Sequence, residues 1–70
     1  MKRRDVIKRI SKEAKDTGVS WGLDHEGGNH SVYDLGGCMI PIPRHKEIGE
    51  GLAREIFKQC EAALGKDWWR

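Results

Sequence analysis

The sequence is poor in the residues on which several common kinds of protein site depend. Its 70 residues include two cysteines, two prolines, one tyrosine and one phenylalanine. Two cysteines cannot build a disulfide scaffold or a four-ligand zinc site. Cys38 and Cys60 both lie among apolar residues, which favours small buried hydrophobes. No glycine pair is followed by the Lys-Ser or Lys-Thr of a phosphate-binding P-loop. We therefore expect neither a metal nor a cofactor.

Long apolar runs are absent as well. The longest stretch without charge, Leu35 to Pro43, is far shorter than the roughly 20 apolar residues of a membrane helix. No apolar segment follows the basic residues 1–5, unlike in a signal peptide. The length excludes Rossmann and TIM-barrel enzymes. We expect a cytoplasmic protein without a membrane partner, folded as one domain over residues 1–65 with a short tail over residues 66–70.

Charge is distributed unevenly although the net charge is only +2. Residues 1–15 contain seven Lys or Arg and two acidic residues, whereas residues 16–35 contain four acidic residues and no Lys or Arg. A positive segment beside a negative one suggests that one end of the molecule contacts a polyanion.

Hydrophobic spacing predicts a first helix over residues 3–15, with Val6, Ile7, Ile10 and Ala14 on one face and Gly18 ending it. The opposite face carries a ridge formed by Arg4, Lys8, Ser11 and Lys15. Such a row can contact phosphates without reading sequence, although many helices have an ordinary solvated face.

Alternating patterns predict three strands, over residues 19–24, 30–35 and 38–42. Turn-forming residues separate them, at residues 25–29 and at Gly36-Gly37. Pro41 cannot donate to a strand ladder, so the third strand should lie at an edge.

A second helix is predicted over residues 49–64, with Gly65 as its C-cap. The fold class is therefore α+β, in the order α-β-β-β-α, with a three-stranded antiparallel sheet. Both helices should pack on one face of that sheet. The residues expected on this face are Trp21, Leu23, Tyr33, Leu35, Ile40 and Ile42, and those expected on the apolar side of the second helix are Ile48, Leu52, Ile56, Phe57, Cys60, Ala63 and Leu64.

His30 opens the second strand, and strand parity directs it to the open face, away from the helices. An imidazole titrates near neutral pH and can take or give a proton there. From spacing alone, a surface histidine in a hairpin is the favoured interpretation. A metal site at His25, Glu26 and His30 is disfavoured because the three residues span a flexible turn.

The segment Arg44-His45-Lys46 precedes the second helix. Cations beside a helix N-terminus can bind phosphate, and a solvated loop is the alternative. Trp68 and Trp69 in the tail could stack on bases, pack back on the domain or bind a partner.

Four segments in order resemble the HicA family of bacterial toxins. They are residues 2–8 (KRRDVIK), residues 28–33 (GNHSVY), residues 42–48 (IPRHKEI) and the helix over residues 52–59. The similarity spans roughly residues 1–60. It implies a fold like that of double-stranded-RNA-binding domains and an mRNA interferase that cleaves RNA without the ribosome. It also implies neutralisation by a HicB-type antitoxin.

The family motif Gly-Ser-His-x-x-aromatic corresponds here to Gly28, Asn29, His30 and Tyr33, with Asn29 in place of the usual serine. The resemblance implies that His30 is the catalytic residue of a metal-independent endoribonuclease. The candidate RNA-binding residues are Arg4, Lys8, Lys15, Arg44, His45 and Lys46. A non-catalytic RNA-binding module and an antitoxin-binding module of the same fold are the alternatives.

Overall fold

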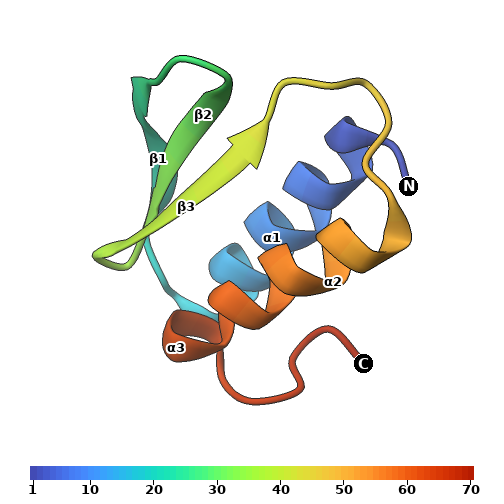
Figure 1. The fold of residues 1–70 in the computed structure, drawn as a ribbon. Helices are drawn as coiled ribbons and strands as arrows, with labels where there is room; N and C mark the ends of the chain where they lie inside the picture. Colours follow the sequence, from blue (N-terminus) through green and yellow to red (C-terminus); the bar gives the residue numbers. More distant parts are fainter.

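The computed structural model describes residues 1–70. Its elements are α1 (Arg3–Thr17), β1 (Trp21–Glu26), β2 (His30–Leu35), β3 (Cys38–Pro43), α2 (Glu50–Gln59) and α3 (Glu61–Leu64). The strands form one antiparallel sheet in the order β1-β2-β3. Figure 1 shows the sheet as one layer, with α1 and α2 beside each other as the second. The predicted α+β class, strand order and antiparallel pairing are confirmed.

The core lies between the helices and one face of the sheet. Strand pairing sets Leu35 opposite Cys38 and Ser31 opposite Ile42, so these side chains share a face. Leu35 and Ile42 are fully buried, whereas Met39, on the other face, is 48% exposed. This confirms that both helices pack on one face. The apolar core consists of Val6, Ile10, Ala14, Leu35, Ile40, Ile42, Ile48, Ala53, Ile56, Phe57, Cys60 and Leu64.

The prediction for α1 is confirmed except that the helix continues to Thr17. Val6, Ile10 and Ala14 are buried, as their spacing predicts. Gly18 adopts the left-handed conformation (φ 75°), and its N–H donates to the carbonyls of the last turn. Any side chain at this position would be strained, which explains why the helix ends at a glycine.

The strands β2 and β3 match their predictions closely. β2 has the predicted bounds, and β3 extends one residue further, to Pro43. β3 is an edge strand, as Pro41 requires. Gly36 (φ 56°) and Gly37 (φ 93°) form the turn between them with two positive φ angles, the backbone that suits a two-residue hairpin.

The prediction for β1 is wrong in position and in burial. The strand runs from Trp21 to Glu26 instead of residues 19–24, so His25 and Glu26 belong to the strand and not to the turn. Leu23 is 51% exposed although it was expected in the core. Leu23 pairs with Tyr33 and so shares the helix-facing side, but β1 is an edge strand that the helices leave largely uncovered; the register shift follows Leu23, before His25.

The second helix differs from its prediction at two points. It is interrupted at Cys60, which separates α2 from the short α3. Leu52 is 47% exposed, and Ala53 is buried in its place. The second helix has apolar residues over a wide part of its surface. Hydrophobic spacing alone therefore does not define which of them faces the sheet. None of the three helices has the length and apolarity that a bilayer-spanning helix requires.

Candidate functional site

Three segments that are distant in the sequence meet at one end of the molecule. The amide of Arg3, in the first turn of α1, donates to the carbonyl of Lys46 at 2.9 Å. The amide of Arg44 donates to the carbonyl of Asn29 in the β1–β2 turn at 3.4 Å. The start of α1, the β1–β2 turn and the loop over residues 44–49 therefore form one unit, which we call the junction.

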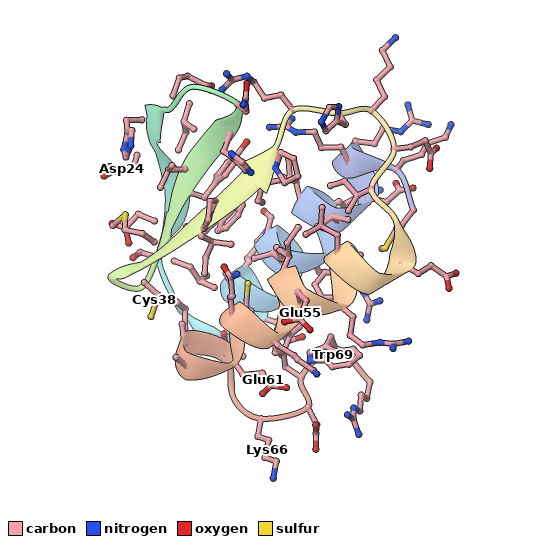
Figure 2. The ribbon with its side chains drawn as sticks, in the orientation of Figure 1. Asp24, Cys38, Glu55, Glu61, Lys66 and Trp69 are labelled. Atoms are coloured by element: carbon pink, nitrogen blue, oxygen red, sulfur yellow. The ribbon has the colours of Figure 1, made fainter.

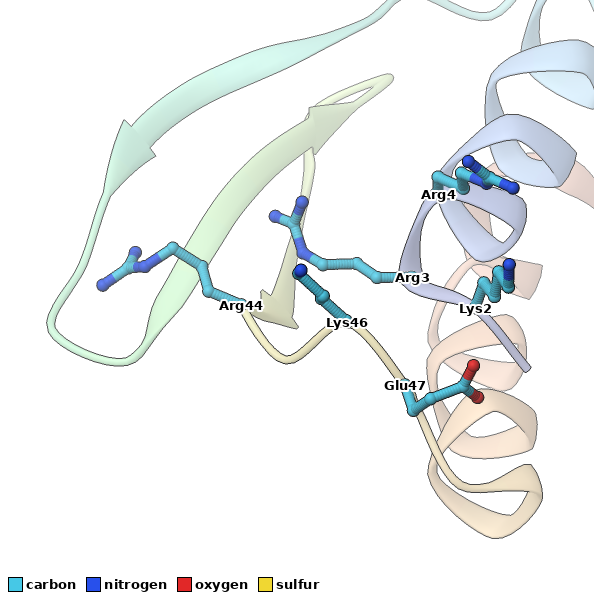
Figure 3. Close-up of a pocket in the computed structure, with 6 residues that line it drawn as sticks. All are labelled: Lys2, Arg3, Arg4, Arg44, Lys46 and Glu47. Carbon is cyan, nitrogen blue, oxygen red and sulfur yellow. The ribbon is translucent and has the colours of Figure 1, made fainter.

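A hollow in the junction is lined almost entirely by cations. Figure 3 shows its six lining residues, of which five are Lys or Arg and one is a carboxylate. They come from the start of α1 and from the loop after β3. Such a concentration of positive charge without an apolar wall suits a polyanion better than a small apolar ligand. The lining residues are Lys2, Arg3, Arg4, Arg44, Lys46 and Glu47.

A second hollow adjoins the first and contains two histidines. It is lined by Asn29, His30, Pro43, Arg44 and His45, so Arg44 borders both hollows. His30 is exposed at the first position of β2, where it pairs with Pro43. The β2–β3 ladder fixes the backbone of His30, and its imidazole is open to a molecule that lies in the hollow.

Arg44 holds the β1–β2 turn in place. Its guanidinium forms an ion pair with Glu26 at 2.7 Å and donates to the carbonyl of His30 at 2.9 Å. It also donates to the carbonyls of Gly27 and Gly28. Figure 3 shows the guanidinium directed toward this turn. Both terminal nitrogens of the Arg44 guanidinium are therefore already engaged, which makes this residue a clamp on the backbone of His30 more than a free phosphate ligand.

A chain of polar contacts continues from this clamp to α1. The Ser31 hydroxyl donates to the carboxylate of Glu26 at 2.7 Å, and Arg3 donates to Ser31 Oγ at 3.0 Å and to the carbonyl of Pro43 at 2.8 Å. The hydrogen bond from Ser31, with the charges of Arg44 and Arg3, holds the pKa of Glu26 below its usual range. Ser31 is buried, and its hydroxyl both donates and accepts a hydrogen bond within this network of polar contacts.

Sequence reasoning missed Arg3, Glu26 and Ser31. Arg3 is one basic residue among several, and Glu26 was expected in a flexible turn. The contacts of Arg3 join residues 28 and 40 positions apart, and the ion pair of Glu26 with Arg44 joins residues 18 apart, so no local spacing indicates them. The one available pattern was strand parity, which sets Ser31 on the helix-facing side of β2.

The remaining sequence candidates are divided between the junction and other parts of the molecule. Arg4, His45 and Lys46 lie in the two hollows. Lys8 and Lys15 are exposed further along α1 and line neither hollow. Tyr33 is stacked on Trp21, with ring centroids 4.5 Å apart, on the opposite face of β2 from His30. Tyr33 therefore packs against β1, while Gly28 and Asn29 lie in the turn that precedes His30.

The tail folds back on α2 and α3. The indole N–H of Trp68 donates to the carbonyl of Phe57 at 2.9 Å, and the two rings meet edge to face. The indole N–H of Trp69 donates to the carboxylate of Glu61 at 2.9 Å, which lowers the pKa of that carboxyl. Both tryptophans are partly buried against the core. Of the three roles considered for the tail, the structure therefore shows packing on the domain.

The third histidine lies outside both hollows. The ring of His25 is hydrogen-bonded to Asp24 at 2.7 Å on the exposed edge strand β1, and Figure 2 shows Asp24 at the outer side of the sheet. The structure contains no group of three or more His, Cys, Asp or Glu side chains arranged to hold a metal ion.

Comparisons with protein-family models, with curated proteins and with solved structures gave no match to this chain.

Proposed function

We propose that the protein is a HicA-type mRNA interferase, a metal-independent endoribonuclease. In this proposal it acts in the bacterial cytoplasm as the toxin of a type II toxin–antitoxin system. One observation supports it above the others. The histidine of the family-like motif, His30, opens into a hollow that shares Arg44 with a strongly cationic hollow. An acid–base group and a phosphate-binding surface thus lie beside each other.

RNA contains its own nucleophile, so the protein needs few chemical groups. The 2′-hydroxyl attacks the adjacent phosphorus, the P–O5′ bond breaks, and a 2′,3′-cyclic phosphate remains. The protein must accept the proton of the hydroxyl and supply one to the leaving 5′-oxygen. His30 is our candidate for one of these transfers, which a positioned side chain accelerates by about 10²–10⁴-fold.

Binding of the RNA backbone is assigned to the cationic hollow. Lys2, Arg4 and Lys46 are the cations there whose side chains hold no other group of the chain, whereas Arg3 and Arg44 are committed to the polar network. Ammonium and guanidinium groups beside the scissile phosphate also stabilise charge that develops in the transition state. Affinity for RNA should then fall with salt, by about 0.7 in log–log slope for each single-strand phosphate contact.

A HicB-type antitoxin would neutralise this site by covering the two hollows. Carboxylates at the places that phosphates occupy would match the five cations of the first hollow. We therefore expect an acidic partner surface that contacts the junction and competes with RNA. Binding of the antitoxin only at the tail, away from both hollows, would contradict this part of the proposal.

A non-catalytic RNA-binding module is the second candidate. The observation that favours it is that the cationic hollow is complete without His30. In that case the protein binds RNA with the same dependence on salt but leaves it intact. Replacement of His30 then changes nothing in RNA integrity.

The test is RNA integrity over time with purified protein in the presence of EDTA. Wild type is compared with His30→Ala and with His25→Ala, a matched control because His25 is an exposed histidine outside the hollows. We expect fragments ending in a 2′,3′-cyclic phosphate from wild type and from the control, and intact RNA with His30→Ala. Equal cleavage by all three proteins would contradict His30 as the catalytic residue, and binding without any cleavage would favour the second candidate.

A further inference from the structure

The reaction requires two proton transfers, and the hollow around His30 contains a second imidazole. His45 lies in the loop after β3 and lines the same hollow. Neither ring is hydrogen-bonded to the rest of the chain, whereas His25 is tied to Asp24. Sequence reasoning gave His45 only a role in RNA binding, because nothing in the spacing of residues 30 and 45 indicates that they line one hollow.

The backbone of the junction fixes both histidines. His30 pairs with Pro43, and Arg44 joins the two segments through its backbone amide, bonded to Asn29, and its side chain, bonded to the carbonyl of His30. Since His45 directly follows Arg44, the same contacts determine where its Cα lies. The start of β2 and the loop after β3 lie side by side, so His30 and His45 line the same hollow, and a phosphodiester bound there borders both residues.

We propose that His30 and His45 form an acid–base pair for RNA cleavage. This inference rests on the proposed endoribonuclease function and goes beyond it by assigning the second transfer. One neutral imidazole accepts the proton of the 2′-hydroxyl as the O2′–P bond forms. The other, protonated, donates its proton to O5′ as the P–O5′ bond breaks. After the step the two rings have exchanged protonation states, and no metal, oxidant or cofactor is consumed.

Charged groups from every neighbouring element surround the pair. Arg44 and Lys46 lie on the same loop as His45, Glu26 lies on β1, and Lys2, Arg3 and Arg4 lie at the start of α1. A cation contact made by His45 to a phosphate is the competing role for this residue. The two roles differ in what they change, because a phosphate contact affects KM and an acid–base group affects kcat and its pH dependence.

The experiment measures kcat and KM against pH for wild type, His30→Gln, His45→Gln and the matched control His25→Gln. We expect a bell-shaped kcat profile for wild type and for the control. Each of the other two variants should lose about 10²–10⁴-fold in kcat and one limb of the bell, with KM little changed. Thermal unfolding and binding of a strand that is 2′-deoxy at the cleavage site verify that each variant folds and binds.

A second substrate assigns the two roles. RNA with sulfur in place of the 5′-oxygen has a leaving group that needs no proton, so it should restore cleavage to one histidine variant and not to the other. A wild-type rate for His45→Gln, a rise in KM alone, or restoration of neither variant would overturn the pair while leaving the endoribonuclease function intact. A wild-type protein that binds RNA without cleaving it would instead overturn both proposals.

Discussion

The helix-packed core and the junction differ in what holds them together. In the core, side chains such as Leu35 and Ile10 are fully buried within a cluster of apolar residues. In the junction, exposed or half-buried residues such as Arg44, Glu26 and Arg3 are joined through hydrogen bonds and ion pairs. Figure 1 shows the loop after β3 running from the end of the sheet across to the start of α1, which is the region of the junction.

The difference separates stability from function. Burial of apolar surface is the dominant favourable contribution to folding, and exposed ion pairs contribute little. The core should therefore determine whether the chain folds, and the junction should determine what the folded chain does.

The largest effect is expected from a truncation in the core. Leu35→Ala should lower the free energy of unfolding by about 2–5 kcal/mol, because it removes a fully buried side chain and leaves a cavity. Leu52→Ala is the matched control, since Leu52 is 47% exposed, and it should change stability by less than about 0.5 kcal/mol. Urea denaturation followed by circular dichroism measures both. Equal losses in the two variants would contradict the assignment of the core.

The tail should behave as part of the core and not as an appendage. Trp68→Ala removes the contact with Phe57 and the bond to its carbonyl. Because Trp68 is only partly buried, we expect a loss of about 2 kcal/mol, near half the ~3–5 kcal/mol of a fully buried tryptophan. RNA binding at low salt should remain unchanged in the folded fraction. A loss of RNA affinity without a loss of stability would show instead that the tryptophan stacks on bases.

Arg44→Ala should have a small effect on stability and a large effect on local order. Exposed ion pairs contribute about 0.2–1 kcal/mol, so the midpoint of unfolding should hardly move. Hydrogen exchange of the Gly27 amide, which donates to the carbonyl of His30, should become faster, while exchange of core amides stays the same. Arg44→Lys should resemble Arg44→Ala, because an ammonium lacks the fork that reaches several acceptors. If the Gly27 amide of the lysine variant exchanged as slowly as in wild type, a positive charge alone would be enough to hold the turn.

The smallest effect concerns pH. The pKa of Glu26 is lowered in the folded state, so its ionised form contributes stability above the unfolded pKa of about 4.3, and this contribution is lost as pH falls through the folded value. Glu61 acts in the same direction at the tail. In Glu26→Gln and in Glu61→Gln, the free energy of unfolding, measured by urea denaturation at several pH values, should fall less steeply with decreasing pH than in wild type. An unchanged loss in Glu26→Gln would contradict the network around Ser31.

The sequence predicted the core better than the junction, and the physical reason lies in the range of the contacts. Apolar spacing in α1 and alternation in β2 report directly which face is buried, so Val6, Ile10 and Leu35 were predicted correctly. Leu23 was not, because periodicity does not tell how far the helices extend over an edge strand. Arg44 was predicted as a phosphate ligand, but its partners lie 14 to 18 residues away, and only the folded turn brings them within reach.

Nuclear magnetic resonance can show whether RNA binds at the junction. Backbone amide shifts are followed as an RNA strand with 2′-O-methyl groups, which cannot be cleaved by its own hydroxyl, is added to the protein. The account predicts that the largest changes occur in residues 2–4, 27–31 and 44–47, and that they diminish as salt is raised. Changes concentrated on the exposed face of the sheet, around Met39 and Pro41, or at Trp68 and Trp69, would contradict it.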